Sequence, residues 1–170
     1  MAATIEIRSY HGATPDSGTD VAGGSIRFKQ ADNDTVDANN PIPVPGAGTA
    51  YSYLKHLRFY ASTTPDNVID NLKFYSDGNN GYGTDVNNYV KTEIAYTDPL
   101  ALGADDMGSG EGYASIFEYT SGAPLSVSGE ITNPSTGAFG SYVKLQMTVG
   151  TTGEQGTTGS ESITFEYDES

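Results

Sequence analysis

The sequence predicts an all-β protein: a two-sheet antiparallel sandwich with long loops rich in Gly, Asn and Pro and little helix. Three observations lead to this prediction. The 170 residues include 21 Gly and 12 Tyr, and only 36% are hydrophobic. Short segments alternate apolar and polar residues, which is the period of a strand with one face in a core. Stretches of turn-forming Gly, Asn, Asp and Pro separate these segments.

Six segments alternate most clearly, and in each the apolar residues fall on one side. They are residues 4–8 (Ile5, Ile7), 25–30 (Ile26, Phe28), 56–62 (Leu57, Phe59), 71–76 (Leu72, Phe74), 141–149 (Val143, Leu145, Met147, Val149) and 161–170 (Ile163, Phe165, Tyr167). Two of them repeat the order Leu-basic-Phe-Tyr, which we interpret as two strands under the same constraint.

Three further segments are more ambiguous. Residues 85–96 fit a helix or a strand, and alternation through Val90, Thr92, Ile94 and Tyr96 favours the strand. Residues 113–121 and 124–131 are also expected to be strands. Residues 98–107 remain a candidate helix.

Polar residues within the alternating segments are expected to face water. This group includes Lys29, Arg58, Lys73, Lys144 and Gln146. A basic side chain can lay its aliphatic stem over neighbours while its charge stays solvated. The two histidines, His11 and His56, are interpreted as surface or hydrogen-bonded residues without a catalytic role.

The length suits a single domain spanning residues 1–170. Residues 1–10 are expected to form a strand or an arm. Residues 31–50 are expected to form an extended acidic and Pro-rich loop, because the prolines at 41, 43 and 45 exclude a helix. Jelly-roll topology is one arrangement of eight or so strands, but the strand order does not follow from the sequence.

Charge and composition restrict the classes of partner. The net charge is −14, so phosphate backbones and anionic membranes are expected to be repelled. Cysteine is absent, which excludes disulfides and thiolate metal sites. The first residues lack the pattern of a signal peptide, and no apolar run is long enough to span a bilayer. We therefore expect synthesis in the cytoplasm of the producing cell.

Catalytic motifs are weak, and we do not expect an enzyme. Ser52 and Lys55, and likewise Ser141 and Lys144, match Ser-x-x-Lys, but that motif needs a helix to bring the two side chains together. Both matches lie in strand-like sequence. Phosphate-binding glycine motifs are also missing.

A low-ranking metal hypothesis concerns Asp77, Asn79 and Asp85. These residues offer hard oxygen ligands on a Gly-rich loop, which suits calcium, although the spacing is not that of an EF-hand. Two other acidic loops invite the same hypothesis: Asp32, Asp34 and Asp37 in one, and Asp105, Asp106 and Glu111 in the other. The alternative for each is an ordinary turn, since Asp, Asn and Gly favour turns for conformational reasons.

Residues 19–78 and 161–170 resemble small virion proteins of tailed bacteriophages. The resemblance rests on the run from "DVAGGSIRFKQ" to "NLKFYSDG" and on the closing "ESITFEYDES". It implies a structural role in a virion, most naturally as a capsid decoration (cement) protein and otherwise as a tail component. It also implies an all-β fold, a homo-oligomer such as a trimer, the major capsid protein as partner, and no active site.

A different class of function remains open from the residues alone. The tyrosines could line a sugar-binding face, because an aromatic ring with a polar tip suits such a surface. With a calcium loop, the chain would then be a calcium-dependent carbohydrate-binding module.

Overall fold

The computed structural model describes residues 2–99, 112–156 and 158–170. Its strands are β1 (Ile5–Tyr10), β2 (Thr19–Asp20), β3 (Ala50–Tyr51), β4 (Lys55–Ala61), β5 (Val68–Ser76), β6 (Val86–Glu93), β7 (Ala114–Ser115), β8 (Leu125–Ser126), β9 (Ile131–Thr132), β10 (Gly137–Val149) and β11 (Ile163–Glu169), with a short 3-10 helix η1 (Ile116–Glu118).

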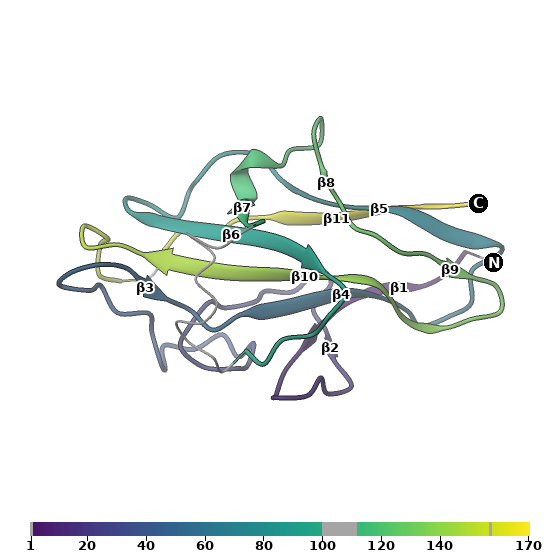
Figure 1. Cartoon of the computed structure of the whole chain (residues 1–170), viewed down its shortest axis with the longest axis horizontal. Helices are drawn as coiled ribbons and strands as arrows, with labels where there is room; N and C mark the ends of the chain where they lie inside the picture. The colour runs from purple at the N-terminus through teal and green to yellow at the C-terminus, as the bar shows by residue number, and fades with distance from the viewer. Residues whose placement is uncertain (1, 100–111, 157) are drawn as a thin grey trace.

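These strands form two antiparallel sheets (Figure 1). The larger sheet has the order β2-β1-β4-β10-β6-β7, and β3 also pairs with β10. The smaller sheet has the order β11-β5-β8, and β9 also pairs with β5. The predicted all-β, two-sheet sandwich is confirmed. Within the described ranges, no helix has the length and apolar character that crossing a bilayer requires.

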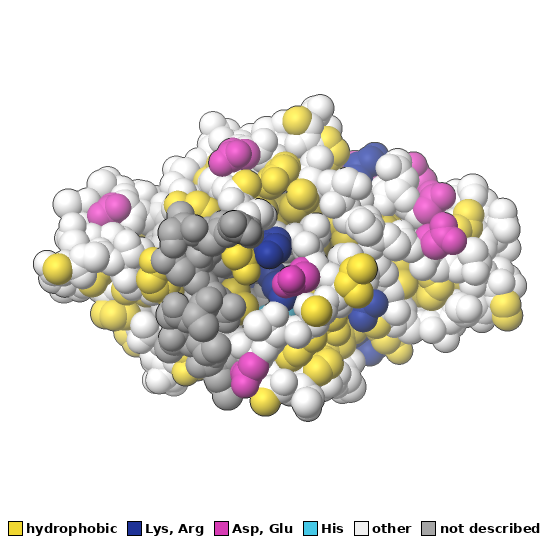
Figure 2. Space-filling view, in the orientation of Figure 1, with side chains coloured by type: hydrophobic (Ala, Val, Ile, Leu, Met, Phe, Trp, Pro, Cys, Tyr) yellow, Lys and Arg dark blue, Asp and Glu magenta, His cyan; other side chains and the backbone are white. Residues whose placement is uncertain are grey.

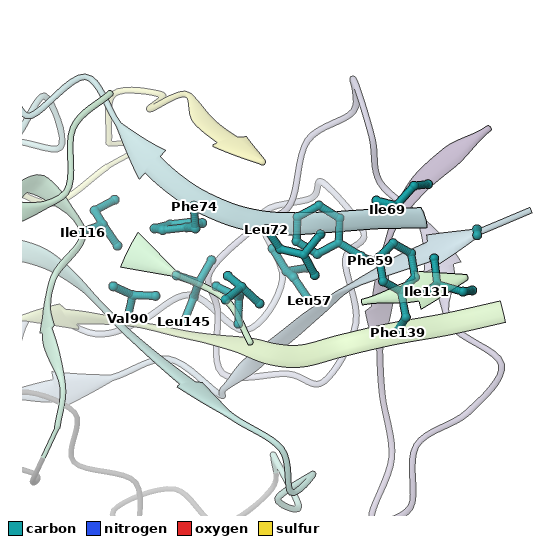
Figure 3. Packing of buried hydrophobic residues seen from close by; sticks show 13 residues of the cluster. Leu57, Phe59, Ile69, Leu72, Phe74, Val90, Ile116, Ile131, Phe139 and Leu145 are labelled. Carbon is teal, nitrogen blue, oxygen red and sulfur yellow. The ribbon is translucent and has the colours of Figure 1, made fainter. Parts of the chain in front are cut away.

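The main core lies between the two sheets and joins the two Leu-basic-Phe-Tyr segments. Leu57 and Phe59 of β4 and Leu72 and Phe74 of β5 belong to one buried cluster (Figure 3). The repeated segments therefore lie in opposite sheets, and the chain crosses between sheets over residues 62–67. Phe165 of β11 packs edge-on against both phenylalanines, at 5.4 Å between ring centres in each case.

β10 is buried on both faces, which corrects the expectation that one face is wet. Its apolar face carries Val143 and Leu145 into the core. On the opposite face, Lys144 and Gln146 are each only 1% exposed. Alternation identifies the apolar face but cannot show that something covers the polar one. Here hydrogen bonds replace water: Lys144 donates to Glu93 and Thr97, and Gln146 donates to the carbonyl oxygen of Ser52.

Residues 25–30 are not a strand, although their alternation predicted one. Gln30 N–H donates to the carbonyl of Asn40, and Tyr53 N–H donates to that of Lys29, so the backbone makes isolated bonds instead of a ladder. Lys29 is 1% exposed, so its predicted exposure is wrong as well. Long-range contacts, and not strand pairing, hold this segment.

The Pro-rich stretch lies on the protein itself. Ile42 and Val44 are half-buried, whereas Pro41 and Pro43 are exposed, and both apolar residues pack with Phe28 against a second buried cluster. That cluster consists of Val86, Met147 and Val149. The fixed φ of proline keeps the segment extended, which directs alternate side chains to the protein.

Other predicted elements are partly correct. Residues 85–96 contain strand β6, but it ends at Glu93, and Ile94 is 81% exposed. Residues 113–121 form only β7 and η1, because Ser115 and Glu118 make a capping box that starts a helical turn. Residues 124–131 contain β8 and the first residue of β9. Most of the candidate helix 98–107 lies outside the described residues.

Gly129 and Gly140 make a close backbone contact at the β10 bulge. A Cβ on Gly129 would lie 2.5 Å from the Cα of Gly140, and the φ of Gly129 is 118°. We expect Gly129→Ala to lower the free energy of unfolding by about 1–3 kcal/mol more than Gly137→Ala does. Gly137 is the control because its φ is 114° and nothing lies near its Cβ position. Urea unfolding measures both, and equal losses would contradict the contact.

Candidate functional site

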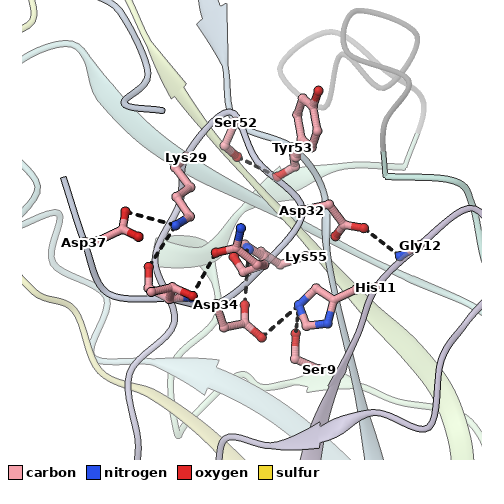
Figure 4. A network of polar contacts seen from close by, with 12 residues as sticks. Ser9, His11, Gly12, Lys29, Asp32, Asp34, Asp37, Ser52, Tyr53 and Lys55 are labelled. Carbon is pink, nitrogen blue, oxygen red and sulfur yellow. Dashed lines mark hydrogen bonds and ion pairs between the residues drawn. The ribbon is translucent and has the colours of Figure 1, made fainter. Parts of the chain in front are cut away.

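A buried ionic network lies at the start of β4, where the 29–37 segment contacts the sheet (Figure 4). Lys55 follows the alternation of Leu57 and Phe59, and its cross-strand partner is the core residue Leu145. Lys55 therefore points to the core side of the sheet, yet it is a cation only 1% exposed. A buried charge of this kind must be paired.

Asp34 connects Lys55 to His11. One carboxylate oxygen lies 3.1 Å from Lys55 Nζ and the other 3.0 Å from His11 Nε2. Lys55 also donates to the carbonyl of Asn33. It therefore binds both a carboxylate and a backbone carbonyl of this loop. Ser9 Oγ lies 3.5 Å from His11 Nε2.

The network shifts the proton affinities of its members. Burial alone raises the pKa of Asp34, but His11, Lys55 and Ser9 outweigh it and hold that pKa well below its usual range. The hydrogen bond to Asp34 raises the pKa of His11 against the effect of burial. Burial lowers the pKa of Lys55, and Asp34 opposes that decrease. The cluster thus favours ionised Asp34 beside protonated His11.

Lys29 fixes the far end of the same segment. Its Nζ donates to the carbonyl of Thr35 at 2.9 Å and to Asp37 Oδ1 at 3.2 Å. Asp37 also accepts from the N–H of Asn39, which closes a turn. Asp32 accepts from the N–H of Gly12 at 2.6 Å. The acidic loop that resembled a calcium site is used for internal ion pairs and turns.

A second buried group lies on the opposite face of the larger sheet. His56 is 0% exposed, and its ring lies 4.4 Å from Tyr96 and 6.0 Å from Tyr142. Neither ring nitrogen has a hydrogen-bond partner in the part of the chain that the structure describes. Burial, with a contribution from Lys144, lowers the pKa of His56 to about 3. His56 is therefore neutral at physiological pH.

The Ser-x-x-Lys matches do not form catalytic pairs. Ser52 Oγ donates to the carbonyl of Tyr53 and accepts from the N–H of Met147, while Lys55 binds Asp34. Lys144 binds Glu93 and Thr97. Each lysine is thus committed to a structural partner other than its serine.

The three calcium candidates have separate hydrogen-bonding roles. Asp77 accepts from the N–H of Asn79 within its own turn. Asp85 has a φ of 57° and accepts from both the N–H and the hydroxyl of Thr152, at 2.9 Å each. The structure joins Asp85 to the 150–153 turn and Asp77 to its neighbour, so the calcium hypothesis stays a prediction. The candidates Asp105, Asp106 and Glu111 lie outside the described residues.

The role of Asp85 gives a direct test of that hypothesis. If the carboxylate of Asp85 only accepts hydrogen bonds from Thr152, Asp85→Asn should lower the melting temperature by the same amount in calcium and in chelator. Differential scanning fluorimetry measures this. A melting temperature that rises with calcium only in the unaltered protein would instead show a bound ion.

A small polar pocket lies beside that loop. It measures about 200 Å³, and Tyr82, Val86, Glu154, Gln155 and Thr158 are among the residues in its wall. Pockets for drug-sized ligands are usually about 300–1,000 Å³, so this one suits only a small group.

Sequence reasoning missed the network because each member was considered separately. Lys29 was expected to face water, and Lys55 was considered only as a Ser-x-x-Lys match. The acidic residues Asp32, Asp34 and Asp37 were considered only as calcium ligands or turn residues. The available signal was the placement of Lys29 and Lys55 on either side of the acidic loop 31–37 in a chain with eight basic residues. Comparison with family models, with curated proteins and with solved structures found no match to this chain.

Proposed function

We propose that this protein is a non-enzymatic structural component of a phage particle, and specifically a capsid decoration protein on the outer surface of the shell. The observation that carries the proposal is how the chain uses its cations. Three of the eight basic residues, Lys29, Lys55 and Lys144, are at most 1% exposed and are paired with carboxylates of the same chain. These lysines, which are potential catalytic groups, instead form ion pairs within the protein.

The exterior is acidic. The three buried lysines are neutralised by carboxylates of the same chain, so the net charge of −14 is carried by the other residues. Such a surface keeps a protein soluble at high copy number before assembly. It also disfavours contact with packaged DNA, which suits a position outside the shell.

The fixed loops suit a protein that must keep its shape on a particle. The 29–37 segment is held by ion pairs and the Pro-rich stretch by apolar packing. Both ends of the chain lie at one end of the sandwich, where Ala3 N–H donates to Glu169 (Figure 1). We propose the major capsid protein as partner and a homo-oligomer, such as a trimer, as the binding unit, since several weak contacts then act together.

Quantitative mass spectrometry of particles purified from the source tests the proposal. We expect this chain at a fixed ratio to the major capsid protein, in intact particles and also in tailless shells. Recovery only in tailed particles would indicate a tail component. Absence from both, with the capsid protein detected, would overturn the proposed function.

A further inference from the structure

Residues 94–98, which we call the flap, follow β6 and contact the outer face of the larger sheet, which is turned away from the smaller sheet. The ladder between β6 and β10 ends where Glu93 pairs with Tyr142. Beyond that point the ring of Tyr96 lies 5.5 Å from that of Tyr142, and the Tyr96 hydroxyl donates to the carbonyl of Gly12 at 2.8 Å. The flap therefore reaches the sheet by side-chain contacts after the strand pairing has ended.

The flap covers His56, which is 0% exposed. The Tyr96 ring lies 4.4 Å from the His56 ring at a tilt of 41°. Thr97, in the same segment, accepts a hydrogen bond from Lys144, which is the cross-strand partner of His56 on β10. In Figure 2, histidine (cyan) is almost completely hidden on the visible face, whereas Lys and Arg (dark blue) lie beside an acidic side chain (magenta) near its middle. One short segment thus buries a titratable ring and binds the lysine beside it.

With the flap closed, the described residues provide no acceptor for a second proton on His56. A neutral imidazole has one donor and one acceptor nitrogen, whereas the protonated ring has two donors. Neither nitrogen of His56 has a hydrogen-bond partner in the part of the chain that the structure describes. The residues paired with His56 are Tyr10 on β1 and the cation Lys144 on β10. Protonation therefore adds a cation beside Lys144 in a site that excludes water, which is costly.

His56 is the group of this cluster that changes charge between about pH 6.5 and 5, the range of an ordinary histidine in mild acid. The hydrogen bond from Lys144 lowers the pKa of Glu93, so Glu93 stays ionised. The hydrogen bond to Asp34 raises the pKa of His11, so His11 is mostly protonated in this range and its charge opposes a proton on His56. The other titratable or charged neighbours are Tyr10, Tyr142 and Arg58 on the strands and Tyr96 on the flap, with Asp16, Asp32 and Asp98 near Tyr96.

Opening the flap leaves the sandwich intact. His56 belongs to β4, which is paired with β1 on one side and β10 on the other, and Leu57 next to it is in the main core. Opening breaks the contacts of Tyr96 and Thr97 but neither the ladders nor the core, so it requires less free energy than global unfolding. Water then reaches His56, which titrates near the ordinary pH of about 6.5. Below that pH the ratio of open to closed flap rises about tenfold per pH unit, because only the open state accepts the proton.

We propose that the flap is a pH-sensitive device: in acid, protonation of His56 releases Tyr96 and Thr97 from the sheet while the sandwich stays folded. Such a device needs a titratable group and an element with two states that the group biases, here His56 and the flap. Release uncovers His56 and the ring of Tyr142, and it removes one of the two hydrogen-bond acceptors of Lys144. The inference does not depend on the proposed function, because it concerns the isolated chain.

Proton NMR of the isolated protein, titrated from pH 7 into acid, tests the proposal. We expect His56 to take up its proton at the pH at which the nuclear Overhauser effect between the His56 and Tyr96 rings disappears. The effect between Phe59 and Phe165, whose ring centres lie 5.4 Å apart in the core, should persist at that pH. Loss of both effects at one pH would show global unfolding. Protonation of His56 with the Tyr96 contact intact would show that the flap does not exclude the proton. Either result overturns the proposal.

A pair of variants tests whether the flap is what shields His56. Tyr96→Ala removes the covering ring, and we expect it to raise the proton affinity of His56 by roughly tenfold or more, which is a rise of one pH unit in the titration midpoint. Tyr60→Ala is the matched control, because it removes a ring from β4 that lies against Arg8, and it should leave that affinity unchanged. Equal midpoints in the two variants would contradict the proposal. Should Tyr96→Ala fail to fold, the titration of the unaltered protein decides.

Discussion

Replacing Asp34 by alanine should lower the free energy of unfolding by about 3–5 kcal/mol, because it leaves a buried cation without its counter-charge. Lys55 is 1% exposed, and Asp34 is the carboxylate 3.1 Å from its Nζ. His11 loses the same partner. Urea unfolding at pH 7 measures the change. Hydrogen exchange should also increase in residues 29–37, which the network holds on the sheet.

The double variant Asp34→Ala/Lys55→Met separates pairing from packing. Removing both charges should recover much of the loss, since a buried ion pair can be replaced by apolar groups at little cost. If the free energy of unfolding lost by the double variant equals the sum of the losses of Asp34→Ala and Lys55→Met, Asp34 and Lys55 do not act as a pair. Ser52→Ala in the same region, which removes no charge, should cost less than Asp34→Ala.

Between pH 6.5 and 5 the protein should lose about 2 kcal/mol of stability, and most of that slope should come from His56. Its pKa is about 3 in the folded protein, against 6.5 for an ordinary histidine. The unfolded chain therefore binds a proton in this window that the folded chain does not. The contribution of His56 to the free energy of unfolding is fully present above about pH 6.5. It falls by about 1.4 kcal/mol per pH unit as pH decreases toward 3. Urea unfolding at several pH values measures the slope.

His11 acts in the opposite direction and serves as the control. Its pKa is raised, so its contribution is fully present below pH 6.5 and is lost as pH rises through the folded pKa. His11→Gln should leave the acid slope intact, whereas His56→Phe should flatten it. Should His56→Phe fail to fold, an NMR titration of the unaltered protein decides: His56 titrating near pH 6.5 would refute the prediction.

The cross-strand pairs explain why the candidate sites were only partly predictable. Alternation placed Leu57 and Phe59 in a core, and that holds for any partner sheet. It said nothing about Lys55, which lies on the same face of β4 but contacts Asn33 and Asp34. There the 29–37 segment takes the place of a sheet, and its acids provide the charges that a buried lysine needs.

Local sequence determined the fold class, because the two-residue period of apolar side chains and the turn-forming segments depend on neighbours in the chain. It also determined that residues 41–45 are extended, through their prolines. Tertiary structure alone decided which polar residues are buried, as Lys144 and His56 show, and which cations stand side by side, as Arg8 and Arg58 do. The physical reason is that burial and electrostatic pairing depend on what lies opposite, and strands far apart in the sequence become neighbours only when the sheets form.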